Sequence, residues 1–230
     1  MARPTPDQLA AATDLARFID ASPSPFHAVA EAARRLDTAG FVGLDETDAW
    51  EERAGGRRYV VRDGSLVAWS VPASPAAGLP LRLVGAHTDS PNLRVKPRPD
   101  RSVAGARQLA VEPYGGVLLN SWLGRELGLS GRVALRSGAL PLVRVDRPVL
   151  HLPQLAIHLD RGVTTEGLRL DPQHHIVPVW GVGTGDAGGF RRFLAAEVGS
   201  GLDEIVAWDV MAHDLAPSTL AGRDGDLLSA

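Results

Sequence analysis

His87 and Asp89 are the residues of this sequence that could most directly build a metal site. They stand two positions apart at the end of the apolar run 81–86, and side chains two apart on a strand point to the same face. A histidine that binds a metal through one ring nitrogen often has the other held by a carboxylate, which fixes its tautomer. The pair therefore predicts a metal-ligating imidazole that Asp89 orients. The alternative is a hydrogen-bonded turn in which Ser90 and Pro91 simply end the strand.

His158 is a second candidate ligand, because it is a polar residue inside the apolar run 155–159, which reads as a strand. A lone histidine in such a strand is more often a hydrogen-bonded core or interface residue than a metal ligand. His151 has the same alternative. His174 and His175 are adjacent, so on a strand they would face opposite ways and could not serve one site.

A glycine-rich segment offers a competing function. Residues 183–188 read GTGDAG, which matches G-x-G-x-x-G, and they lie between a strand-like run and a predicted helix. That is the context that a dinucleotide-binding fold requires. Asp186, however, would place a negative charge inside the pyrophosphate cradle. We therefore favour a flexible glycine loop over nucleotide binding.

Composition narrows the chemistry further. The 230 residues are 44% hydrophobic and 22% charged, which supports a packed core. The absence of cysteine excludes a disulfide framework, a thiolate metal site and a cysteine nucleophile, so a metal would be held by His, Asp or Glu. The net charge of −3 does not favour a nucleic-acid partner. Without a secretory leader or a long apolar run, we expect no membrane partner and a cytoplasmic location.

The elements that must position these residues begin with two helices. Apolar residues recur at helical spacing before residue 20, and Ser24 is a predicted N-cap for a second helix that ends near Gly40. His27, early in that helix, is expected to be structural. Asp63 and Gly64 between two β-rich runs predict a hairpin. The run 81–86 then predicts a strand buried on both faces.

From residue 92 to about 180 the sequence changes in character. Short apolar runs alternate with Gly, Pro and Asp clusters, which predicts a small sheet or barrel-like β unit. A short helix is expected over 189–198, followed by another strand. The chain thus combines an α/β beginning with a β-rich insertion.

At these residues the sequence resembles the M18 family of zinc aminopeptidases, of the aspartyl aminopeptidase type. The similar segments occur in the family's order and cover nearly the whole chain: 22–29, 84–97, 114–133, 152–163, 168–181 and 214–222. The resemblance implies the start of a metallo-exopeptidase α/β sandwich, interrupted by a β-rich dimerisation domain. The implied boundaries are 1–92 for the first part of the catalytic domain, 93–215 for the β-rich domain and 216–230 for the return.

The resemblance also implies a function. Family members use Zn²⁺ to release an N-terminal residue, typically acidic, from peptide substrates, and they form homo-oligomers through the β-rich domain. By position, His87 corresponds to a zinc ligand, Asp89 to the catalytic carboxylate that orients it, and His158 to a histidine placed with the metal site.

Family members are roughly twice this length, and the resemblance implies that their remaining ligands follow the position of Ala230. We therefore expect the isolated chain to be inactive. The alternative is a non-catalytic oligomerisation or regulatory module derived from such an enzyme.

Overall fold

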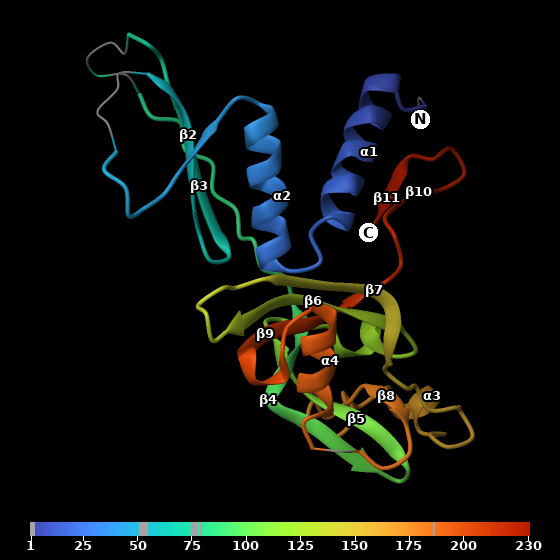
Figure 1. Ribbon diagram of the computed structural model, residues 1–230. Helices are drawn as coiled ribbons and strands as arrows, with labels where there is room; N and C mark the ends of the chain where they lie inside the picture. The colour runs from blue at the N-terminus through green and yellow to red at the C-terminus, as the bar shows by residue number, and fades with distance from the viewer. Residues whose placement is uncertain (1–2, 51–54, 75–77, 79, 186) are drawn as a thin grey trace. The chain divides into compact units, whose positions relative to one another are not determined.

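The computed structural model describes residues 3–50, 55–74, 78, 80–185 and 187–230, which form two compact units. The first unit comprises Met1–Ser90 and Pro217–Ala230, and the second comprises Pro91–Ala216. Figure 1 shows helices and short sheets in the first unit and a strand-rich second unit. The chain is therefore mixed α/β, as the sequence predicts, and it contains more sheet than helix.

The first unit begins with the two predicted helices, α1 (Pro6–Asp20) and α2 (Pro25–Thr38). Thr5 caps α1 in a capping box, because its hydroxyl accepts from the Gln8 amide while the Gln8 side chain accepts from the Thr5 amide. Ser24 caps α2 as predicted, and its hydroxyl accepts from the amide of His27.

Two small sheets complete this unit. Strand β1 (Val42–Leu44) pairs in parallel with β2 (Gly56–Arg62), which pairs antiparallel with β3 (Ser65–Val71). The predicted hairpin is confirmed, and Asp63 adopts the positive φ of 53° that its tight turn requires. Strands β10 (Thr219–Ala221) and β11 (Leu227–Ser229) form a separate antiparallel hairpin.

The predicted buried strand over 81–86 is wrong. Residues 80–91 are irregular, and Leu81, Leu83 and Val84 are 85%, 88% and 99% exposed. No strand in the described part of the chain pairs with this segment. An apolar run becomes a central strand only when neighbours supply hydrogen bonds and cover both faces, and here neither is present.

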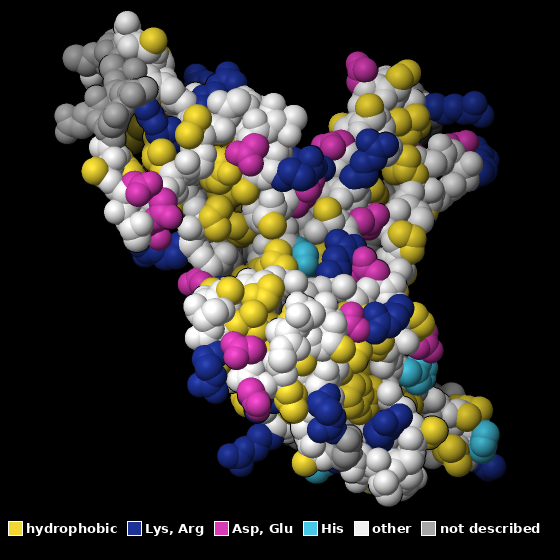
Figure 2. Space-filling model, in the orientation of Figure 1, with side chains coloured by type: hydrophobic (Ala, Val, Ile, Leu, Met, Phe, Trp, Pro, Cys, Tyr) yellow, Lys and Arg dark blue, Asp and Glu magenta, His cyan; other side chains and the backbone are white. Residues whose placement is uncertain are grey.

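The apolar core of the first unit is small. Among the described residues, its buried hydrophobic side chains are Phe26, Val29 and Val60, and α1 buries none. Figure 2 shows hydrophobic side chains at the surface around α2 and the β2–β3 hairpin.

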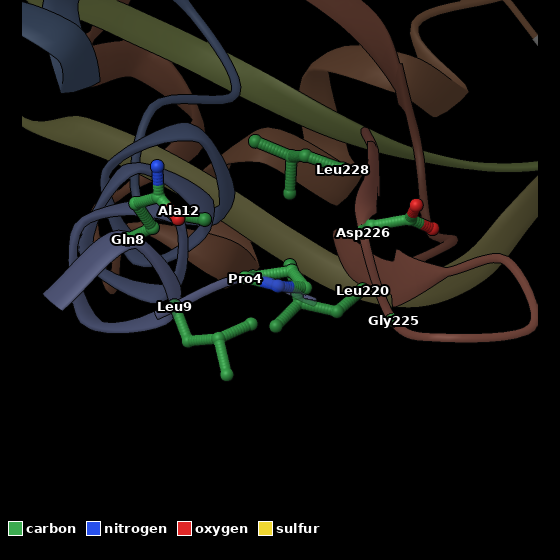
Figure 3. Close-up of a pocket in the computed structure, with 8 residues that line it drawn as sticks. All are labelled: Pro4, Gln8, Leu9, Ala12, Leu220, Gly225, Asp226 and Leu228. Atoms are coloured by element: carbon green, nitrogen blue, oxygen red, sulfur yellow. The ribbon is translucent and has the colours of Figure 1, made fainter. Parts of the chain in front are cut away.

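A cavity of about 360 Å³ lies between α1 and the β10–β11 hairpin (Figure 3). Its apolar lining includes Leu9 and Ala12 of α1 and Leu220 and Leu228 of the hairpin. The helix and hairpin therefore meet without filling the space between them, which is consistent with the small core of this unit.

The second unit is a closed β-barrel, which confirms the predicted β-rich unit. Its strands pair in the order β4-β5-β8-β7-β6-β9, and β9 pairs with β4 to close the barrel. The bounds are Asn92–Val103 for β4, Ala106–Tyr114 for β5, Glu126–Leu135 for β6, Leu142–His151 for β7, Val179–Val182 for β8 and Ile205–Asp214 for β9. Gly131 permits the close approach of β6 to β9, because a Cβ there would collide with the carbonyl oxygen of Asp209.

Short helices join the barrel strands. They are the 3-10 turns η1 (Leu119–Trp122) and η2 (Leu202–Glu204), and the α-helices α3 (Val163–Glu166) and α4 (Gly189–Glu197). Helix α4 matches the helix predicted over 189–198. Its Phe190 and Leu194 are fully buried in the same apolar cluster as the barrel strands, and Phe190 makes edge-to-face contacts with Trp180 and Trp208.

Candidate metal site

His87 and Asp89 lie in contact in the irregular segment that precedes the barrel. The Nδ1 atom of His87 is 2.6 Å from the backbone carbonyl oxygen of Asp89 and 3.5 Å from its carboxylate. A carbonyl oxygen only accepts hydrogen bonds, so Nδ1 must carry the ring proton when the imidazole is neutral. The unprotonated Nε2 then has its lone pair available for a metal.

The local support for this pair comes from the β2–β3 hairpin. The Thr88 hydroxyl donates a 2.6 Å hydrogen bond to the carbonyl of Gly64, in the hairpin turn. Gly64 in turn lies against Pro25 and Phe26 at the start of α2. The His87 side chain is itself 80% exposed. The structure therefore brings His87 and Asp89 together in irregular backbone and not through the strand alternation that the sequence predicts.

His158 belongs to the second unit and lies in an exposed turn. The turn is closed by hydrogen bonds from the amide of Leu159 to the carbonyl of Ala156 and from Asp160 to Ile157. The predicted strand over 155–159 is therefore wrong, and neighbouring Leu155, Ile157 and Leu159 are exposed with it. Backbone bonds within the turn replace the ladder that a strand would need.

The donor set offered by this chain is partial. No group of three or more His, Asp or Glu side chains that could hold a metal occurs within the described ranges. A catalytic zinc site generally needs three protein ligands. His87 supplies one imidazole with a fixed tautomer, so the described residues do not complete a zinc site by themselves.

A carboxylate of the protein itself accepts hydrogen bonds from backbone amides at the end of the glycine-rich loop. Asp100 of β4 accepts hydrogen bonds from the amides of Gly188 and Phe190, at 3.1 and 2.9 Å, at the N-terminus of α4. Those amides would have to face the phosphates in a dinucleotide site. Asp100 therefore counts against the nucleotide alternative. Asp186, which also counted against it, lies outside the described residues.

Three other histidines have structural partners. The Nδ1 atom of His27 is 2.7 Å from the hydroxyl of Ser24, which agrees with the structural role expected for it. His151 lies 3.0 Å from the carboxylate of Glu126 on the neighbouring strand. The Nε2 atom of His213 lies 3.2 Å from Asp146, and burial lowers the pKa of His213 although this carboxylate opposes the shift.

His174 and His175 lie in a loop organised by Asp171. The Asp171 carboxylate accepts from the amide of His174, while Nδ1 of His175 accepts from the amide of Asp171. The hydrogen bonds that the Asp171 carboxylate accepts from the amides of His174 and Gln173 lower the pKa of Asp171.

Comparison with known proteins defines the class of protein to which this fold and partial site belong. Residues 18–230 match a family described as "Aminopeptidase I zinc metalloprotease (M18)". The chain is 56% identical over 218 residues to a "Probable M18 family aminopeptidase 2" of Streptomyces avermitilis, covering 94% of this chain and 50% of the relative. The chain thus falls in the class of zinc metallopeptidases, and the relatives that it matches are named as aminopeptidases.

Solved structures agree with this match. The chain superposes with a TM-score of 0.87 and 28% identity on a protein in the "Cryo-EM structure of the Ape4 and Nbr1 complex", covering 99% of this chain and 49% of that one. It shares its fold, at 24% identity and a TM-score of 0.77, with the "Structure of S. cerevesiae mApe1 dodecamer", covering 95% and 51%. The chain belongs to the M18 family of aminopeptidases, and it spans about half the length of the curated relatives it matches.

No helix among the described residues is long and apolar enough to cross a membrane.

Proposed function

We propose that this chain is part of a zinc aminopeptidase and that His87 is one of its zinc ligands. The observation that supports this most directly is the 2.6 Å contact between Nδ1 of His87 and the carbonyl of Asp89, which leaves Nε2 for a metal. The family match adds that the relatives are zinc metalloproteases. When bound, zinc lowers the pKa of a coordinated water and polarises the scissile carbonyl.

We further propose that the substrate is a peptide with an acidic N-terminal residue and that the chain alone is inactive. The substrate preference comes from the family resemblance. Inactivity follows from the ligand count among the described residues, because one prepared imidazole cannot hold a zinc ion in place of three ligands. We also propose His158, whose ring is exposed in its turn, as a residue of the metal site.

A single-chain chimera tests the proposal. This chain is fused to the half of the S. avermitilis relative that it does not match, and zinc content and cleavage of aspartyl, glutamyl, leucyl and lysyl anilides are measured. We expect zinc, and fastest cleavage of the acidic substrates. His87→Ala should remove both zinc and cleavage, whereas His174→Ala, another loop histidine, should preserve both. A His87→Ala chimera that kept its zinc and its activity would refute the proposal.

The variant Asp89→Asn distinguishes the role of the Asp89 backbone carbonyl from that of its carboxylate. The carbonyl at 2.6 Å remains, while the carboxylate at 3.5 Å loses its charge. We expect zinc affinity and cleavage to fall by about 10- to 100-fold, the usual effect of changing a group that orients a ligand. A loss as complete as that of His87→Ala would mean that the carboxylate has a more direct role.

The closed barrel favours a second, non-catalytic candidate function. The second unit has an extensive apolar core of buried side chains from the barrel strands and α4, and one neighbour with the same fold is described as a dodecamer. We propose that this unit supports homo-oligomers, and that an inactive chain could thereby join assemblies of full-length relatives. Size-exclusion chromatography of this chain mixed with the S. avermitilis relative tests this, because separate elution of the two proteins would exclude it.

A further inference from the structure

His213 is a histidine whose side chain lies almost wholly within the barrel sheet. It belongs to β9 and stands opposite Gly128 of β6, and its side chain is 10% exposed. The ring lies directly on Gly128, because a Cβ added there would come within 2.8 Å of the ring atoms Cε1 and Nε2. The glycine therefore leaves the space that the imidazole occupies.

The ring contacts an irregular part of strand β7. Beside it the register of β6 and β7 shifts, and four residues of β7, 146–149, lie opposite one residue of β6. We call residues 146–149 the β7 bulge. Its first residue, Asp146, has a carboxylate oxygen 3.2 Å from Nε2 of His213, and its second, Arg147, forms an ion pair with Glu197 of α4. The bulge is thus attached both to β9 and to α4.

One of the two ring nitrogens of His213 lacks a partner. A carboxylate accepts hydrogen bonds, so Nε2 carries the proton of the neutral ring and donates to Asp146. Nδ1 is buried and has no hydrogen-bond partner among the described residues. A second proton, on Nδ1, would place a charged and unsatisfied donor inside the sheet. That costs more free energy than leaving a neutral acceptor there.

The charged groups around the ring determine how it responds to pH. On β7, Asp146 favours the protonated ring, whereas Arg144, which donates to the same carboxylate at 2.7 Å, opposes it. Strand β6 presents a glycine between two leucines. On β9 the adjacent Asp214 forms an ion pair with Arg125. Burial has the largest influence, so the pKa of His213 lies below its ordinary value of 6.5.

We propose that His213 is a pH-dependent switch that holds the β7 bulge to β9 while its imidazole is neutral and releases the bulge when the imidazole is protonated. The protonated ring reaches water only by leaving Gly128 and giving up its hydrogen bond to Asp146. The bulge then keeps its ion pair to α4 alone. A histidine of this kind changes charge within the physiological pH range.

The bulge can open without unfolding of the barrel. Its residues Asp146, Arg147 and Pro148 are exposed, whereas Val145 before it and Leu150 after it are buried in the barrel core. Opening of such an exposed segment between two fixed ends is a local event. Because the folded-state pKa of the ring lies below the unfolded one, the contact contributes its full stability above pH 6.5 and loses it as the pH falls through the folded-state pKa.

Nuclear magnetic resonance of the full chain tests the switch between about pH 7.5 and about pH 5. At the upper pH we expect a nuclear Overhauser effect between the ring protons of His213 and the Hα protons of Gly128, because the ring lies on that residue. Its intensity should fall at least about threefold as the ring is protonated, with a midpoint below pH 6.5. The amide resonances of Asp146 and Arg147 should shift with the same midpoint.

Three variants identify the groups involved. His213→Gln keeps an N–H that can donate to Asp146 but does not titrate, so the bulge resonances should no longer change over this pH range. His151→Gln is the matched control, because it removes another histidine of the barrel, at the end of β7. It should leave the bulge transition unchanged. Asp146→Asn should move the midpoint of His213 to lower pH, since it removes the charge that favours the protonated ring.

Three results would overturn the inference: a protonated His213 that keeps its contact with Gly128, a bulge transition that persists in His213→Gln, or a midpoint that rises in Asp146→Asn. The first and the third decide the matter even where His213→Gln does not fold. None of the three measurements involves zinc, His87 or peptide cleavage, so the outcome is separate from that of the proposed function.

Discussion

The two units of this chain differ sharply in how they are stabilised. The barrel unit buries twenty hydrophobic residues and closes its sheet, so its strands have partners on both sides. The first unit buries three hydrophobic residues among those described and depends on helix caps, a hairpin and surface ion pairs. Burial of apolar area is the dominant favourable term in folding. The comparison teaches that an extensive apolar core stabilises the barrel unit, whereas the described part of the first unit depends mainly on local contacts.

The largest effect should come from the barrel core. Phe190→Ala removes a fully buried ring that contacts Trp180 and Trp208, and it should lower the free energy of unfolding by about 3–5 kcal/mol. Leu83→Ala is the contrasting variant in the other unit and should change it by less than about 0.5 kcal/mol, because Leu83 is exposed. Denaturant unfolding of the isolated chain measures both. Equal losses in the two variants would contradict the comparison.

Hydrogen exchange should show the same asymmetry within one sample. We expect amides of α1 and β2 to exchange through local opening at much lower free energy than amides of β6 and β9, which lie in the barrel sheet. Mass spectrometry of peptides across the chain gives both rates together. If all four elements exchanged through a single global transition, the first unit would not be the weaker one.

An intermediate effect is expected where the barrel unit depends on one polar side chain. Asp100→Ala removes the carboxylate that accepts from the amides of Gly188 and Phe190. The free energy of unfolding should fall by about 1–2 kcal/mol, as it does when other caps of helix N-termini are removed. Asp100→Asn keeps one acceptor oxygen and should retain part of the stability that Asp100→Ala loses. An unchanged thermal midpoint in Asp100→Ala would show that α4 is held by its apolar face alone.

Local signals explain what could be predicted from the sequence. Ser24 before Pro25 and the Asp63–Gly64 turn act within a few residues, and the corresponding helix and hairpin form as predicted. The segments 81–86 and 155–159 were predicted as strands from their apolar runs. Whether such a run becomes a strand depends on neighbours elsewhere in the structure, and in the described part of the chain neither run has a strand partner.

The candidate site, too, could be predicted from the sequence only in part. The proximity of His87 and Asp89 follows from their spacing, but the atom that meets Nδ1 is the backbone carbonyl, which no side-chain pattern could reveal. Asp100 was missed because it lies 88 residues from the amide of Gly188 that it accepts from. No sequence signal joins residues so far apart, and the metal role of His87 stays a prediction.

Acid should produce the smallest effect and should act on the two units separately. In α2, Glu31 accepts hydrogen bonds from Arg34 and from Arg35, which lower its pKa from 4.5 to about 2. Because the folded-state pKa lies below the unfolded one, the stabilisation is full above pH 4.5 and disappears as the pH falls toward 2. Both arginines are at the surface, so the change should be small.

Glu31→Gln tests this directly, because it should abolish the acid-dependent part of α2 opening between pH 4.5 and 2, measured by hydrogen exchange of the α2 amides. The matched control is Glu112→Gln in the barrel unit, where a hydrogen bond from Lys96 lowers the carboxyl pKa. That variant should alter acid sensitivity in β5 and leave α2 unchanged. If Glu112→Gln also changed the opening of α2, the two units would not respond to acid independently. They would then have to be treated as one cooperative unit.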